Sequence, residues 1–174
     1  MYLHKTFCLF VTIIFISSAC NSTLSDREKV FQQLKENQAQ ISYQIDNKNF
    51  YPQESIFTGE VHVSNKLLSM TLDNQFDGKT IISFGGEKWY KQVPVSKQLF
   101  VNNEINAGIK MGRLTNKEKM IGEAYMMSEG EMTLEEFSKD RIVISIEGKA
   151  GKYSDFKQPD TLLIVKGNQK SDQH

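Results

Sequence analysis

The chain has 174 residues, of which 24% are charged, and its 21 basic residues balance its 21 acidic ones. This balance excludes the strongly basic class of nucleic-acid-binding protein. Two cysteines are too few for a disulfide-stapled scaffold, and the length suits one domain with a sizeable core.

Residues 1–19 have the pattern of a secretion signal. A short basic start at His4 and Lys5 precedes an apolar run over residues 7–16, in which only Thr12 is polar. This run is about half of the roughly 20 residues that a helix needs to span a bilayer. Small residues follow it over 17–19, as they do before a cleavage site. The pattern therefore predicts a signal peptide that is removed.

Cys20 stands where a bacterial lipoprotein signal carries its modified cysteine, and the segment before it resembles a relaxed lipobox with Ser17 in place of the usual leucine. The Cys20 thiol would accept a diacylglycerol, and the amine freed by cleavage would take a further acyl chain such as palmitate. Two or three acyl chains anchor a protein stably in a membrane. We expect lipid attachment at Cys20, with residues 20–24 as attachment site and tether. The alternative is ordinary secretion, with Cys20 as an unmodified thiol.

The exported part begins with one helix and continues as strands. Ser25 and Glu28 have capping-box spacing, and Val30, Phe31 and Leu34 share one face of a helix that the pattern extends to about Gln38. From residue 41 the apolar residues alternate with period two between turn residues, which indicates antiparallel strands. The expected strands are 41–45, 60–63, 68–72, 80–84, 105–114, 121–126, 131–134, 141–146 and 162–165.

This order predicts a mainly β fold: an antiparallel sandwich or barrel-like domain with one short N-terminal helix. We expect residues 25–167 to form a single β-rich domain, and the polar residues 168–174 to form a disordered tail.

The stretch 43–50 and the late hairpin over 129–134 and 144–148 resemble the small β-domain envelope lipoproteins of Bacteroidetes. The resemblance spans most of residues 41–153 and depends on strand alternation and turn glycines. It implies an envelope location and a β fold, and it supplies no catalytic residues.

Three patterns suggest chemistry, and each has a simpler interpretation. His62 shares a strand face with Glu60 and Ser64, which we interpret as a solvent-facing polar stripe rather than a catalytic line. The stretch 73–84 partly imitates a calcium loop but has Phe84 where a bidentate glutamate is needed, so we interpret it as a hairpin turn. Paired carboxylates such as those at 135–136 would serve a hydrolase only if they faced a partner across a cleft.

Methionines are frequent in the second half of the chain, and thioethers can bind Cu(I). Because their spacing does not repeat, we interpret them as flexible core side chains. We therefore predict no catalytic residue, metal site or cofactor. The methionines in question are Met111, Met120, Met126, Met127 and Met132.

One stretch is a candidate ligand surface: Lys88, Trp89, Tyr90 and Lys91, which place the only tryptophan among lysines. Aromatic rings flanked by cations can stack on sugars or contact acidic glycans and lipid head groups. The alternative is that Trp89 or Tyr90 closes one end of the β core.

We expect a lipid-anchored cell-envelope protein that is not an enzyme and acts as a binding or structural module. Its partners would be the membrane, through the N-terminal lipid, and a glycan or an envelope protein, but not nucleic acid. Asn21 after the cysteine favours the outer membrane, on its periplasmic or surface face. The alternatives are an inhibitor or immunity protein for a partner enzyme, and a carboxylate-dependent hydrolase.

Overall fold

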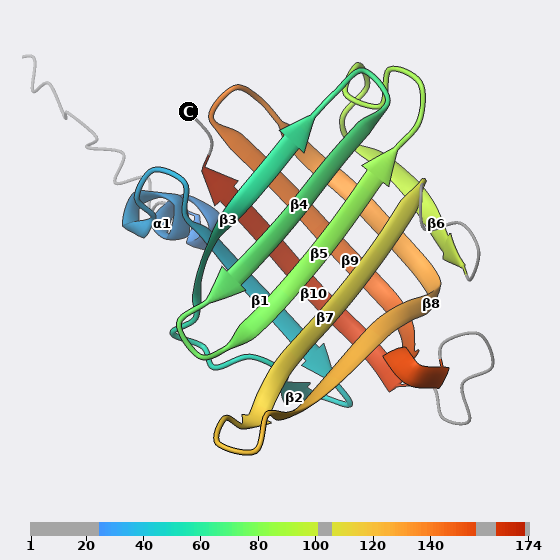
Figure 1. Ribbon diagram of the computed structural model, residues 1–174. Coiled ribbons are helices and arrows are strands. Elements are labelled where there is room, and N and C mark those ends of the chain that lie inside the picture. Colours follow the sequence, from blue (N-terminus) through green and yellow to red (C-terminus); the bar gives the residue numbers. More distant parts are fainter. Residues whose placement is uncertain (1–24, 101–105, 156–162, 173–174) are drawn as a thin grey trace, which may run out of the picture.

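The computed structural model describes residues 25–100, 106–155 and 163–172 (Figure 1). The fold is mainly β, with antiparallel strands and one short N-terminal α-helix, as predicted. The signal, Cys20 and the tether lie outside the described residues. Within the described part of the chain, no helix has the length and apolar character needed to cross a membrane.

The strands follow one another around a curled sheet in which sequence neighbours are mostly spatial neighbours. Neighbouring strands are hydrogen-bonded in the order β10-β9-β8-β7-β5-β4-β3-β1-β2. The remaining strand, β6, pairs with residues 129–134 of β8. The first long strand, β1, also pairs with the last strand, β10, so the pairings close into a ring (Figure 1). The elements are α1 Asp26–Gln33, β1 Ala39–Ile45, β2 Lys48–Asn49, β3 Ile56–Val63, β4 Leu67–Asn74, β5 Gly78–Gly85, β6 Val95–Phe100, β7 Ala107–Asn116, β8 Ile121–Phe137, β9 Arg141–Lys152, the 3-10 turn η1 Tyr153–Asp155 and β10 Leu163–Asp172.

The main cluster of buried side chains lies inside this ring. On β4 alternate residues are buried, as the period of two requires, and the same alternation recurs on β1 and β5. A small ring of strands encloses a space just wide enough for side chains. The largest buried side chains are Tyr43, Phe57, Leu68, Met70, Ile82, Phe84, Ile109, Met111, Met126, Met132, Leu134 and Ile142.

The methionines mostly serve the packing role predicted from the sequence. Met111, Met126, Met127 and Met132 are each at most 2% exposed, whereas Met120 is 73% exposed in the turn between β7 and β8. Four of the five are therefore buried side chains, of which Met111, Met127 and Met132 belong to the core cluster, and Met120 is exposed.

Helix α1 lies on the outer wall of the ring. Ser25 caps it, accepting from the Glu28 N–H at 3.2 Å, as the capping-box spacing predicts. Phe31 packs with Leu34 against Val143, which faces outward from β9, and the Arg141 guanidinium lies 4.5 Å from the Phe31 ring centroid. The helix ends at Gln33 rather than Gln38 because Leu34 is already extended.

The structure corrects three strand predictions. Residues 121–126 and 131–134 belong to one strand, β8, whose register shifts between Met127 and Glu129. The strands β2 and β6 have no counterpart among the predicted strands, because β2 has only two residues and Pro94 directly precedes β6, whose apolar residues alternate weakly. Residues 168–172 are not a disordered tail but the end of β10, paired with β1 on one side and β9 on the other. Hydrogen bonds to a neighbouring strand on each side pair the backbone N–H and C=O groups of a strand, whatever the polarity of its side chains.

Candidate functional site

Trp89 lies inside the core and not on a binding surface. Its side chain is 4% exposed, and its indole N–H donates to the Ser64 carbonyl oxygen at 3.0 Å. The Phe137 ring lies 4.7 Å away and the Phe84 ring 6.3 Å away, both edge-on. This is the second of the two interpretations above, an aromatic side chain that closes one end of the core. Trp89 has no free ring face for a ligand.

The rest of the candidate ligand surface stays near the solvent. Tyr90 is partly buried against Trp89, with ring centroids 5.4 Å apart, and its hydroxyl lies 3.4 Å from the Asn65 side-chain oxygen. Lys88 and Lys91 are exposed. Lys88 and Lys91 thus remain exposed at this end of the sheet, but the tryptophan ring that would have stacked on a ligand is buried.

The residues of the other candidate patterns take ordinary structural places. The side chains of His62 and Glu60 are both largely exposed, and the His62 Nε2 atom lies 3.4 Å from a Glu60 carboxylate oxygen, which matches a solvent-facing polar stripe. The stretch after Asp73 is the hairpin turn between β4 and β5, where the Asn74 side-chain oxygen accepts from the backbone of Phe76. Glu135 pairs with Arg27 of α1. Among the residues that the structure describes, no three His, Cys, Asp or Glu side chains group closely enough to hold a metal.

A small polar cluster lies buried in the ring. The Tyr51 hydroxyl donates to the Lys79 carbonyl oxygen at 2.6 Å and lies 2.9 Å from the Thr80 hydroxyl. Tyr43 is 2% exposed, and its hydroxyl makes no hydrogen bond of ordinary geometry among the described residues. Burial raises the pKa of both tyrosines well above their usual value of 10.0, and the neighbouring Tyr51 adds to the shift at Tyr43.

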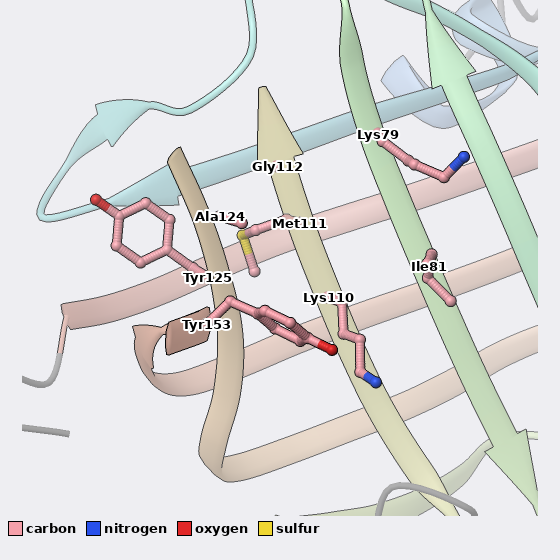
Figure 2. Close-up of a pocket in the computed structure, with 8 residues that line it drawn as sticks. All are labelled: Lys79, Ile81, Lys110, Met111, Gly112, Ala124, Tyr125 and Tyr153. Atoms are coloured by element: carbon pink, nitrogen blue, oxygen red, sulfur yellow. The ribbon is translucent and has the colours of Figure 1, made fainter. Parts of the chain in front are cut away.

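The outer wall carries a hollow of about 190 Å³ where β5, β7 and β8 run side by side (Figure 2). Two rows of paired residues cross these strands. Lys79, Gly112 and Ala124 form one row, and Ile81, Lys110 and Met126 form the next. Residues paired across strands share a face of the sheet, and here that face is the outer one because Ile109 and Met111 point into the core. We call this site the Gly112 hollow; its lining is Lys79, Ile81, Lys110, Met111, Gly112, Ala124, Tyr125 and Tyr153.

Two tyrosines border the Gly112 hollow from different directions. Tyr153 of η1 reaches toward Lys110, whose ammonium nitrogen is 5.5 Å from the Tyr153 ring centroid (Figure 2). Tyr125 points away from them, and its hydroxyl donates to a Glu123 carboxylate oxygen at 3.2 Å. Partial burial, followed by the Glu123 charge, raises the pKa of Tyr125.

Gly112 is a glycine that the fold does not require. A Cβ there would meet its nearest atoms, the Ala124 Cβ and the Glu123 carbonyl oxygen, at 3.5 Å, which is ordinary contact. By contrast, a Cβ on Gly148 would lie 2.6 Å from the Gly130 Cα. A glycine inside a strand weakens it and often marks a close approach by a ligand or another backbone. The Gly112 hollow therefore exists because a side chain is missing where one would fit.

A second hollow, of about 300 Å³, opens beside β1. There the chain bulges away from β1, which pairs with β3 at only two positions, Ala39 and Gln40. Neutral polar side chains dominate its rim: Gln40, Ser42, Asn49 and Gln53, next to Tyr51 and Pro52. We call it the amide hollow.

The sequence contained one signal for the Gly112 hollow, a glycine within the alternating stretch 105–114. It contained no signal that Tyr153 would lie over the same strands, because that contact joins segments far apart in the chain. The aromatic stretch at 88–91 is the stronger sequence pattern, although its tryptophan is a core residue.

Comparisons with known proteins leave this site to be interpreted from its own geometry. A scan against protein-family models and searches of curated proteins and of solved structures found no match to the chain.

Proposed function

We propose that this protein is a lipid-anchored module of the bacterial cell envelope that binds ligands on the outer wall of its β domain and is not an enzyme. The anchor is Cys20, and the outer membrane is the favoured site. The observation that carries the binding mode is the pair of hollows, one over β5, β7 and β8 and one beside β1, both lined by described residues.

The tether bears on where the domain would work. The described fold starts at Ser25, the cap of α1, five residues after Cys20. At about 3.8 Å per residue, a lipid on Cys20 would keep the cap within about 19 Å of the membrane surface. Such a short tether would hold the domain close to the membrane surface, where the domain would meet glycans and other envelope proteins.

The amide hollow supports a glycan as one ligand of this module. Side-chain amides and hydroxyls both donate and accept, as sugar hydroxyls require. Its rim carries neutral polar side chains, which suits an uncharged, hydroxyl-rich ligand.

The anchor is tested by cell fractionation of the wild type and of Cys20→Ala. We expect the wild type in the membrane fraction with acyl chains on its mature N-terminus by mass spectrometry, and the variant in the soluble fraction. Ser22→Ala is the matched control and should remain in the membrane. A Cys20→Ala protein that still fractionates with membranes would refute the lipid anchor.

An inhibitor of a partner enzyme is the second candidate, and one observation favours it. The turns before β5 and β8 lie together, joined by an ion pair of 2.9 Å between Asp77 and Lys117. Three large apolar residues in and beside these turns are exposed to solvent: Phe76 is 41% exposed, Met120 73% and Ile121 53%. Met120 also has φ of 51°, a conformation that side chains other than Gly, Asn and Asp seldom adopt.

A large exposed side chain held in a strained turn fits an apolar anchor for a partner protein. If this candidate is correct, a single stoichiometric partner should co-purify with the wild type and be lost with Met120→Asn, which keeps the turn. Val63→Asn, at another exposed apolar position, is the control. Equal recovery of the partner with both variants would remove the turns as its binding site.

A further inference from the structure

We propose that the Gly112 hollow binds a small aromatic anion, a single ring that carries a carboxylate. The proposal deepens the outer-wall binding mode proposed above and gives this hollow a ligand class distinct from that of the amide hollow. Size, lining and charge each restrict the ligand.

Size restricts the apolar part to one ring. An apolar cavity of about 150 Å³ is enough for benzene, whereas sites for drug-sized molecules have about 300 to 1,000 Å³. The Gly112 hollow, at about 190 Å³, lies just above the first value. A ring with one small substituent fits it, and a larger ligand would project into solvent.

The lining favours a flat apolar face. Gly112 and Ala124 are directly paired, so at this row β7 and β8 present no side chain longer than a methyl group. Ile81 borders one side and the ring of Tyr153 the other. Tyr153 is 45% exposed, so part of its side chain is accessible to an aromatic ligand, which can meet the ring edge to face.

Charge selects an anion. The charged side chains that line the hollow, Lys79 and Lys110, are both cations. Lys79 stands directly across from Gly112, and Lys110 directly across from Ile81. The Lys79 ammonium lies 3.2 Å from Asp73, but both side chains are more than half exposed, so water weakens that pair and a ligand carboxylate can share the lysine. The aliphatic stems of the lysines cover apolar surface while their heads reach the rim.

The glycine is the strongest single argument. A residue with a side chain would strengthen β7 and would meet no atom closer than 3.5 Å at its Cβ. What the glycine provides is the space itself. Binding and stability therefore make opposite demands at this position, which makes the proposal testable without damaging the fold.

The experiment is a ligand-observed fluorine NMR titration of the full-length lipoprotein in nanodiscs of zwitterionic lipid. The probes are fluorobenzoate, neutral fluorobenzamide and cationic fluorobenzylammonium. We expect fluorobenzoate to bind with Kd of about 1 mM, and the other two about tenfold more weakly or not at all. Empty nanodiscs provide the background for partition into lipid.

Variants locate the site. Gly112→Val should abolish fluorobenzoate binding, and Gly112→Ala should weaken it severalfold while the unfolding temperature stays equal or rises. Lys110→Gln combined with Lys79→Gln should remove the preference for the anion but leave weak binding of all three probes. Lys48→Gln, an exposed lysine on β2 that makes the same charge change, should bind as the wild type does.

Three results would overturn the proposal. Equal affinity for fluorobenzoate and fluorobenzamide would refute the choice of an anion. Unchanged binding to a folded Gly112→Val or Gly112→Ala protein would place the ligand elsewhere. Absence of fluorobenzoate binding to the wild type would refute the ligand class, whereas the fractionation of Cys20→Ala tests the lipid anchor independently.

Discussion

The rings of Tyr43 and Tyr51 lie 5.8 Å apart inside the β domain, yet only the Tyr51 hydroxyl makes hydrogen bonds of ordinary geometry. Tyr51 donates to the Lys79 carbonyl oxygen and lies 2.9 Å from the Thr80 hydroxyl, while the Tyr43 hydroxyl has at most a poorly aligned contact with Thr80 among the described residues. An unpaired buried hydroxyl costs about 1 to 3 kcal/mol, so neighbouring residues of the same type should make opposite contributions to stability.

Removal of each hydroxyl tests this difference. Tyr43→Phe should raise the free energy of unfolding by about 1 kcal/mol, because it removes an unpaired polar group and keeps the ring. Tyr51→Phe should lower it by about 1 to 2 kcal/mol, because the Lys79 carbonyl and Thr80 lose their partner. Urea denaturation of the two variants measures both values. Destabilisation by Tyr43→Phe would show that its hydroxyl is hydrogen-bonded, for instance to water.

The same tyrosines predict a loss of stability at alkaline pH. Their pKa is raised in the folded chain, so above about pH 10 the unfolded chain releases protons that the folded chain keeps. Their contribution is intact below pH 10 and falls as the pH rises toward the folded-state pKa, by up to about 1.4 kcal/mol per pH unit for each tyrosine. Denaturation curves across this range should show a shallower decline for Tyr43→Phe. Parallel curves for the variant and wild type would contradict the raised pKa of Tyr43.

Two glycines should respond in opposite ways to alanine. Gly112→Ala should leave the free energy of unfolding unchanged or raise it by about 0.5 to 1 kcal/mol, since the new Cβ makes ordinary contacts in a strand. Gly148→Ala should lower the free energy of unfolding by about 1 to 3 kcal/mol or more, because its Cβ would lie 2.2 Å from the Glu129 carbonyl oxygen. Thermal unfolding monitored by circular dichroism compares the two. A strongly destabilised Gly112→Ala protein would mean that the fold does require this glycine.

Trp89 should report on the core and not on a ligand. Its emission should be blue-shifted and resistant to quenching by iodide, since the side chain is 4% exposed. Trp89→Ala should cost about 3 to 5 kcal/mol in urea denaturation, as large core truncations do. Lys91→Ala, at an exposed neighbour, should change stability by less than about 0.5 kcal/mol. Efficient quenching in the native protein would contradict the buried placement.

The strands that could be predicted from the sequence are those in which alternation matches burial. On β4 the residues Leu68, Met70 and Leu72 are buried, and the sequence pattern identifies the same side chains. The cap at Ser25 was predictable because its partner, Glu28, is three residues away. Local chemistry determines such features, so a sequence reveals them directly.

The rest depends on contacts between distant segments. The last strand looks like a polar tail until β1 and β9 are known to flank it. Trp89 looks like an exposed stacking platform until Ser64 and Phe137 are placed around it. The Gly112 hollow needs three strands and η1 to be brought together, and a glycine in one strand gives only a weak indication of that arrangement.

The pairing of β1 with β10 has a consequence for how the protein is made. The ring joins residues 39–45 to residues 165–171, so it cannot close until residues 165–171 have been synthesised. Contacts so distant in sequence slow folding. The order of the strands therefore leaves β1 without its β10 neighbour until residues 165–171 have been made.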